Sequence, residues 1–186
     1  QARCRRNAYP LLKADKQVMF VVDSHCDSIQ RVDRGLQKLK NPYNMSRKRL
    51  QCQFVAMFCC WPRETPEESH ARMLRYARLY EEQLHKQADL IVGCRTGREV
   101  EAALASGKNA VVMTLEGGTG LLGSTEVLEH MYSLGARVCG LTWSDNDLGA
   151  SDRADPDTGL TPLGIEMAKK CLELGMLIDV SHLSDR

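Results

Sequence analysis

Apolar runs and amphipathic stretches alternate along most of the chain. Runs rich in branched and aromatic residues predict five strands, at 19–25, 53–61, 110–116, 138–143 and 176–182. Apolar residues at helical spacing predict helices between them, at 65–86, 98–106, 124–134 and 161–175. Such alternation predicts an α/β fold with a parallel sheet, either doubly wound or a (β/α)8 TIM-type barrel.

Local signs mark the ends of several of these helices. The stretch "TPEE" at 65–68 offers a capping threonine, a proline at the first helical position and a glutamate that completes a capping box. The threonine and proline recur at 161–162, and Gly135 and Gly175 are suited to end helices. The long acidic loop at 147–160 is expected to lie over the carboxyl ends of the strands.

Composition narrows the class of protein. A chain of 186 residues with 43% hydrophobic content predicts one domain with a real core. The net charge of +1 gives no reason to expect a nucleic acid or a membrane surface as partner, and no apolar run is long enough to span a bilayer. The 8 cysteines are irregularly spaced without a CxxC pair, which favours buried free thiols in a reducing compartment.

The two ends of the sequence lead to further expectations. Residues 1–18 are basic and polar without the apolar core of a signal peptide, so we expect a flanking or disordered segment. Met19 would be a natural start, which favours a cytoplasmic location. The sequence stops soon after the fifth predicted strand, whereas a (β/α)8 barrel needs about 250 residues. We therefore expect residues 19–186 to be the N-terminal part of a barrel, with about five β/α units.

Imidazole and carboxylate side chains stand at the ends of predicted strands. In "VVDSHCDSI" at 21–29, an apolar run ends in Asp23, His25 and Asp27, which share one face if the strand alternates regularly. Glu116 ends the third strand and His182 the fifth. The carboxyl ends of parallel strands meet at one edge, so His25, Asp27, Glu116 and His182 are predicted to converge. These donors suit zinc, and a carboxylate that bridges two ions is a common hydrolytic arrangement.

Other ionisable residues are weaker candidates. Asp23 should face the same way as His25 but deeper, where it either supports a ligand or is a satisfied buried carboxylate. Asp179 should face the helices and serve the structure. Three histidines on predicted helices are expected to be surface or cap residues: His70, His85 and His130.

A dinucleotide site is an alternative. The stretch "GTGLLG" at 118–123 spells G-x-G-x-x-G between a strand and a helix, and Asp145 falls near the place of a ribose-binding acid. The charge of Glu116, two residues before the first glycine, would oppose a pyrophosphate. The glycines are better explained as a loop that turns closely past Glu116. A nucleophilic Cys26 is weaker still, because its side chain should point away from His25.

The motifs resemble the membrane dipeptidase (renal dipeptidase, peptidase M19) family of the amidohydrolase superfamily. "DSHCD" at 23–27 resembles its D-x-H-x-D strand, and "EGG" at 116–118 resembles its bridging glutamate segment. The stretch "GLTPLGIEMAKKCLELGMLIDVSH" at 159–182 resembles its fifth-strand region. Most other amidohydrolases carry H-x-H on strand one, so H-x-D is discriminating. The resemblance covers residues 19–186.

The resemblance implies a (β/α)8 barrel that hydrolyses dipeptides with two Zn²⁺ ions and a hydroxide held between them. By position, His25 and Asp27 would bind the first ion, His182 the second, and Glu116 would bridge both as the catalytic carboxylate. Family members are often homodimers. The remaining zinc ligand, the arginine for the substrate carboxylate and an acid/base aspartate would lie beyond residue 186, so the chain alone is expected to be inactive.

One residue departs from the family pattern. Many members have L-T-H on strand four, where the histidine contacts the substrate, but this chain has Trp143 in "LTWSDND". An indole can donate one hydrogen bond but cannot change protonation state near neutral pH. Trp143 is therefore a substrate-binding candidate that leaves two alternatives open: another metal amidohydrolase, acting on a different small amide, or a degenerate, non-catalytic metal-binding barrel.

Overall fold

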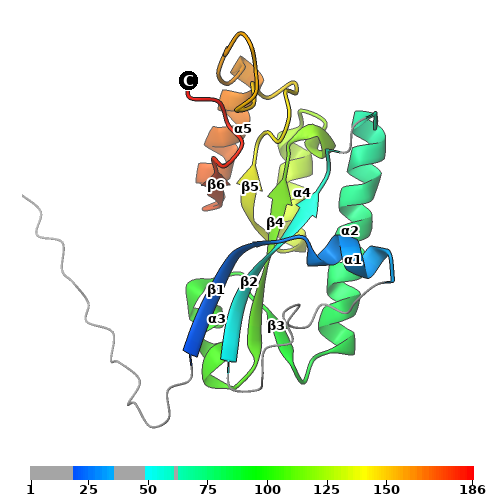
Figure 1. Ribbon diagram of the computed structural model, residues 1–186, viewed down its shortest axis with the longest axis vertical. Helices are drawn as coiled ribbons and strands as arrows, with labels where there is room; N and C mark the ends of the chain where they lie inside the picture. Colours follow the sequence, from blue (N-terminus) through cyan, green and yellow to red (C-terminus); the bar gives the residue numbers. More distant parts are fainter. Residues whose placement is uncertain (1–18, 36–48, 61–62) are drawn as a thin grey trace, which may run out of the picture.

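The computed structural model describes residues 19–35, 49–60 and 63–186 (Figure 1). The predicted flanking segment 1–18 and Trp61, the last residue of the second predicted strand, lie outside the described residues. The elements in chain order are β1 (Met19–Cys26), α1 (Ser28–Asp33), β2 (Arg49–Phe58), α2 (Pro66–Lys86), β3 (Ile91–Gly93), α3 (Gly97–Ala105), β4 (Asn109–Glu116), η1 (Thr119–Leu121), α4 (Thr125–Leu134), β5 (Ala136–Gly140), α5 (Pro162–Glu173) and β6 (Leu177–Asp179).

The strands form one parallel sheet in the order β1-β2-β4-β5-β6, with the short β3 paired beside the start of β4. The predicted parallel α/β architecture is therefore confirmed. The main core lies between the sheet and its helices, where Met57 and Leu115 belong to the same buried cluster as Met73 and Tyr76 of α2. A smaller buried cluster joins the first halves of β2 and β4 to α3.

The predicted helix starts are confirmed. Thr65 Oγ1 accepts a hydrogen bond from Glu68 N at 3.2 Å, and the Glu68 carboxylate accepts one from Thr65 N at 2.9 Å. Thr161 Oγ1 accepts a hydrogen bond from Gly164 N at 3.1 Å at the start of α5. Gly135 ends α4 with a φ of 122°, a backbone angle that favours glycine. These ends form as predicted because capping involves only neighbours in sequence.

Several predicted boundaries are wrong. The elements α1 and β3 are not among the predicted ones, and β2 begins four residues earlier than predicted, at Arg49. The fourth predicted strand was extended to Trp143, but β5 ends at Gly140. The fifth was extended to His182, but β6 ends at Asp179. Asp179 Oδ1 accepts hydrogen bonds from Ser181 N and Ser181 Oγ, which turns the chain out of the strand.

A bulge in β1 changes which side chains share a face. Asp23 pairs with Gln53, and the next pair is Cys26 with Val55. Between these two pairs β1 therefore has one residue more than β2. Gln53 in turn pairs with Val111, so Asp23 shares a face with Val111. Val111 packs in the core toward the helices. The prediction that Asp23 shares a face with His25 is therefore wrong, because the extra residue shifts the alternation.

The last residues of three neighbouring strands lie at one level. Phe58 pairs with Glu116, Glu116 with Gly140, and Gly140 with Asp179. Paired residues of parallel strands point to the same side, so Asp179 shares the face of Glu116. The prediction that Asp179 faces the helices is wrong, because its register follows β5. Phe58, Glu116 and Asp179 therefore lie side by side on one face at the ends of their strands, next to the candidate metal site described below.

The cysteines and the helices of the described residues bear on the predictions made from composition. The cysteines within it are free and buried, as predicted: Cys26, Cys52, Cys59, Cys60, Cys94, Cys139 and Cys171. Cys4 lies outside the described residues. In the same residues, no helix is both long enough and apolar enough to cross a bilayer.

Candidate metal centre

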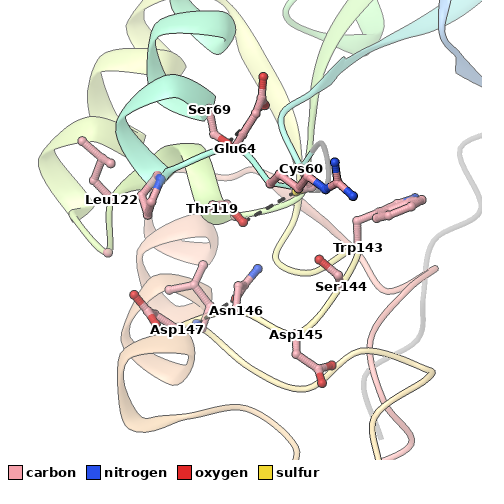
Figure 2. A pocket seen from close by; sticks show the side chains of 15 residues that line it. Cys60, Glu64, Ser69, Thr119, Leu122, Trp143, Ser144, Asp145, Asn146 and Asp147 are labelled. Carbon is pink, nitrogen blue, oxygen red and sulfur yellow. Dashed lines mark hydrogen bonds between the residues drawn. The ribbon is translucent and has the colours of Figure 1, made fainter.

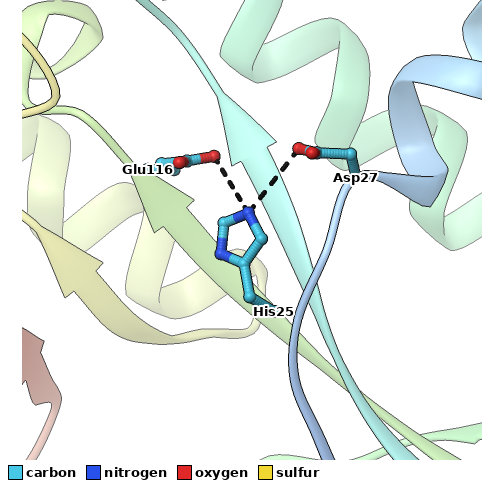
Figure 3. A group of neighbouring side chains, drawn as sticks. All are labelled: His25, Asp27 and Glu116. Carbon is cyan, nitrogen blue, oxygen red and sulfur yellow. Dashed lines mark ion pairs between the residues drawn. The ribbon is translucent and has the colours of Figure 1, made fainter. Parts of the chain in front are cut away.

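Three of the predicted ligands meet where β1 and β4 end (Figure 3). His25 Nε2 lies 3.4 Å from Glu116 Oε2 and 3.7 Å from Asp27 Oδ1. One ligand atom from each residue lies within 4.8 Å of the other two. Glu116 is the most buried of them, with 12% of its side chain exposed, and the other two open toward solvent. This is the spacing that a single cation would require.

His182 approaches the other oxygen of the same carboxylate. Its Nε2 lies 3.7 Å from Glu116 Oε1, whereas His25 faces Oε2. The structure thus brings all four predicted site residues together around Glu116, although His182 stands three residues beyond the end of β6. A carboxylate whose two oxygens face two separate imidazoles has the arrangement of a bridging ligand.

Local structure fixes each of these residues. Asp27 occupies the N-cap position of α1 and accepts a hydrogen bond from Gln30 Nε2 at 2.8 Å. The backbone carbonyl of His182 accepts hydrogen bonds from Thr142 Oγ1 at 2.9 Å and from Asp152 N at 3.0 Å. Thr142, which the sequence assigned to a strand, therefore ties the segment after β5 to the segment after β6. These contacts hold the candidate ligands in place from separate elements.

The electrostatics of the cluster favour a bound cation. Interaction with Asp27 raises the pKa of His25, and the same contact lowers the pKa of Asp27. Burial raises the pKa of Glu116, and the charges of Asp27 and Asp179 raise it further while the two imidazoles oppose them. In the described part of the chain, no lysine or arginine forms an ion pair with Glu116 or Asp27. Imidazole and carboxylate donors that lack a fixed cation fit a divalent metal such as zinc.

Trp143 lies directly beside the cluster. Its ring centroid is 6.0 Å from that of His182 and 5.1 Å from that of Phe58, where the interplanar angle is 78°. This edge-to-face contact holds the indole in place. An aromatic residue in a buried strand ordinarily indicates core packing, so the sequence alone does not point to Phe58. Only the strand register places it in this site.

A cavity of about 410 Å³ lies beside Trp143, which is one of its lining residues (Figure 2). Its walls come from the starts of α2 and η1 and from the loop after β5. The polar lining includes Thr119, Asn146 and Asp147, while Leu122 and Leu148 supply apolar surface. The candidate ligands do not line this cavity, so Trp143 stands between it and the metal centre.

The structure does not support the dinucleotide alternative. Gly117 N donates to Gly140 O at 3.1 Å, and Gly118 N donates to Leu141 O at 2.9 Å. These amides are therefore not available for a pyrophosphate. Asp145 accepts hydrogen bonds from the backbone and hydroxyl of Ser151, both at 2.8 Å, which anchors its own loop.

The remaining histidines lie on helices, as predicted. His70 and His85 each place Nδ1 within hydrogen-bonding distance of a backbone carbonyl, of Gly120 at 2.9 Å and of Glu81 at 2.8 Å. His130 is exposed on α4. None belongs to the metal-ligand cluster found among the described residues.

Solved structures of known proteins share the fold of this chain. Two solved structures resemble the chain with TM-scores of 0.76: a metallopeptidase described as dipeptidase AC, at 22% identity, and a Rhodobacter sphaeroides metallopeptidase liganded with a phosphinate mimic of the dipeptide L-Ala-D-Ala, at 21% identity. They cover 91% and 89% of this chain, which covers 58% and 59% of theirs. The likeness shows that the fold is part of a TIM-type barrel, as predicted.

Sequence comparison gives the family. Dipeptidase verJ of Clonostachys rogersoniana is 31% identical over 104 residues, which are 54% of this chain and 27% of verJ. The chain thus spans about a quarter of that relative. The family described as membrane dipeptidase (peptidase family M19) matches residues 12–186. The chain therefore belongs to the membrane dipeptidase family, peptidase family M19.

Proposed function

We propose that the protein carrying this chain is a zinc-dependent dipeptidase that hydrolyses a dipeptide bond with a metal-activated water. The observation that carries the proposal is the position of Glu116, whose Oε2 faces His25 at 3.4 Å and whose Oε1 faces His182 at 3.7 Å. Membership of a dipeptidase family supports the same reaction.

Each residue has a distinct role in this proposal. His25 and Asp27 would hold one zinc ion and His182 a second, and Glu116, whose two oxygens face the two imidazoles, would serve both. When bound, such a pair of ions supplies Lewis-acid activation of a water and of the substrate carbonyl. Asp27 keeps His25 oriented through their contact, and the Thr142 hydroxyl fixes the backbone of His182. Trp143 forms the wall against which the substrate lies.

The substrate class rests on two kinds of support. The relative verJ is named a dipeptidase, and the Rhodobacter sphaeroides structure holds a mimic of L-Ala-D-Ala. An alternative is a metal amidohydrolase that acts on an acylated amino acid or a cyclic amide. Trp143 favours this alternative, because its indole cannot take up or release a proton during the reaction. A panel of dipeptides, N-acyl amino acids and cyclic amides separates the two.

The metal assignment is tested by zinc stoichiometry and affinity, measured with elemental analysis and competition against a fluorescent chelator. We expect two zinc ions per chain in the unaltered protein. His25→Ala and His182→Ala should each lose one ion, whereas Glu116→Gln should weaken both. His85→Ala, an exposed histidine on α2, is the matched control and should change neither.

The reaction is tested by chromatography of the products from L-Ala-D-Ala, with zinc added and then removed by a chelator. Hydrolysis should require zinc and should fall at least about 100-fold in Glu116→Gln, since one transition-state interaction is worth about that much. Equal zinc content in Glu116→Gln and the unaltered chain would contradict the bridging role. Hydrolysis that survives complete zinc removal would contradict the mechanism.

A further inference from the structure

The guanidinium of Arg153 lies over the ring of Trp143, with Cζ 5.8 Å from the ring centroid. This is within the range of a cation–π contact. Because Trp143 also contacts His182, Arg153 brings a permanent positive charge to the side of the metal centre. The sequence alone does not single out Arg153, because an arginine in a long acidic loop resembles an ordinary solvated charge.

The loop that carries Arg153 is anchored to the site. Asp152 N donates to the carbonyl of His182 at 3.0 Å, and Ser151 donates twice to Asp145. Ser151 also forms a β-bridge with Leu183, just after the candidate ligand His182. The backbone on the N-terminal side of Arg153 is thus fixed relative to the metal centre by this bridge, in which Asp152 N donates to His182 O and Ser184 N donates to Ala150 O. A guanidinium on such a backbone can reach only a limited region beside Trp143.

Arg153 has no counter-ion among the residues that the structure describes, where no carboxylate lies within 4.0 Å of its guanidinium. Two other arginines of the described residues are ion-paired: Arg72 with Glu64, and Arg75 with Asp33 at 2.7 Å. An exposed guanidinium beside a binding site has donors available for a ligand carboxylate, which it can bind in a bidentate manner.

We propose that Arg153, held over Trp143, is a specificity-determining residue that selects substrates with an acidic side chain. This inference rests on the proposed dipeptidase function. Every dipeptide has a C-terminal carboxylate, so that group cannot distinguish one dipeptide from another. A cation at this position distinguishes substrates only through a second carboxylate, which an aspartate or glutamate side chain supplies.

The cavity beside Trp143 suggests the opposite preference, for substrates with a basic side chain. It is lined by Asp145 and Asp147 as well as Arg63, so its charge is mixed. Asp145 is already engaged by Ser151, and in Figure 2 its carboxylate points away from Thr119. A basic side chain bound by Asp147 is the competing outcome, and the experiment includes it.

The test compares Ala-Asp with Ala-Asn and Asp-Ala with Asn-Ala, pairs that differ only by carboxylate and amide. Both assays use the protein that carries this chain. Binding is measured by calorimetry on its metal-free form, where zinc-dependent turnover does not interfere, and kcat/KM is measured with zinc. We expect the acidic member of one pair to be favoured about tenfold or more, as for a charge-assisted hydrogen bond. Arg153→Gln should abolish that preference, Arg153→Lys should keep part of it, and added salt should weaken it.

Arg98→Gln, an exposed arginine on α3, makes the same charge change elsewhere and is the matched control. The inference is overturned if neither assay shows an acidic preference, if the preference survives Arg153→Gln, or if Ala-Lys is preferred and Asp147→Asn removes that preference. Failure of the proposed function gives a different result. In that case zinc-dependent hydrolysis is absent while acidic dipeptides still bind better than their amides.

Discussion

Gly117 follows the candidate bridging ligand at a position where only glycine fits. Its φ is 88°, and an added Cβ would come within 1.8 Å of Cys60 Sγ and within 3.6 Å of Trp143 Cβ. Its amide also donates to Gly140 O, which joins the turn after β4 to β5. The absence of a side chain at Gly117 therefore lets the loop pass between Cys60 and Trp143 and keeps Glu116 at the end of its strand.

Replacing this glycine gives a prediction at the residue scale. Gly117→Ala should destabilise the chain more than Gly107→Ala, which has a φ of 80° but no atom within 4 Å of the added Cβ. Both variants carry the backbone strain, and only the first carries the clash, which should cost about 1–3 kcal/mol. Urea unfolding followed by circular dichroism measures the difference. Equal midpoints for the two variants would show that Cys60 moves aside without cost.

At the scale of elements, the start of α2 links local sequence to the site. Glu64 precedes the helix and binds Arg72 in its second turn, while Ser69 Oγ donates to Glu64. Glu64 and Ser69 also line the cavity beside Trp143. The residues that flank the capping box of α2 thus form one cavity wall.

Removing the cap tests this link. Thr65→Ala removes the acceptor for Glu68 N and should lower the free energy of unfolding by about 1 kcal/mol. Thr96→Ala removes an equivalent capping box from α3 and should cost a similar amount. We expect only Thr65→Ala to weaken dipeptide binding as well, because the cavity is lined by the substrate-binding candidate Trp143 and α3 does not contribute to it. Equal effects of both variants on binding, measured by calorimetry, would show that this cavity wall takes no part in binding.

At the scale of the molecule, exposed apolar side chains gather at the β6 end of the sheet. Leu177 and Val180 are 63% and 67% exposed, and Leu172 of the neighbouring α5 is 66% exposed. In the described residues, β6 pairs with β5 alone, so its other edge has unpaired backbone groups. Such an edge is suited to pair with a further strand or another molecule.

This exposure predicts concentration-dependent association. Sedimentation velocity on the 186-residue chain should show oligomers that increase with concentration. Changing both Leu177 and Val180 to lysine should shift the chain to monomers, because charged residues oppose edge pairing. Leu90→Lys, at an exposed leucine before β3, is the control and should leave association unchanged. A chain that stays monomeric across the micromolar range would contradict the prediction, and the homodimer suggested by the resemblance stays untested.

The sequence by itself determined the features that depend on neighbouring residues. The alternation of strands and helices, the caps at Thr65 and Thr161 and the chemical types of the candidate ligands were all predictable, because periodicity and capping act over a few residues. Even the convergence of His25, Asp27, Glu116 and His182 could be predicted, because the carboxyl ends of parallel strands meet at one edge. The metal roles of these residues stay a prediction.

The tertiary structure decided what depends on register. The bulge in β1 turned Asp23 toward the helices, and the pairing of β5 with β6 placed Asp179 on the face of Glu116. The pairing of β2 with β4 and of β4 with β5 brought Phe58 to Trp143. The anchored loop after β5 placed Arg153 over the indole. A one-residue shift reverses every face of a strand, and nothing in a strand's own residues records where its partner begins. The chain supplied the chemistry of the site, and the sheet decided which side chains share it.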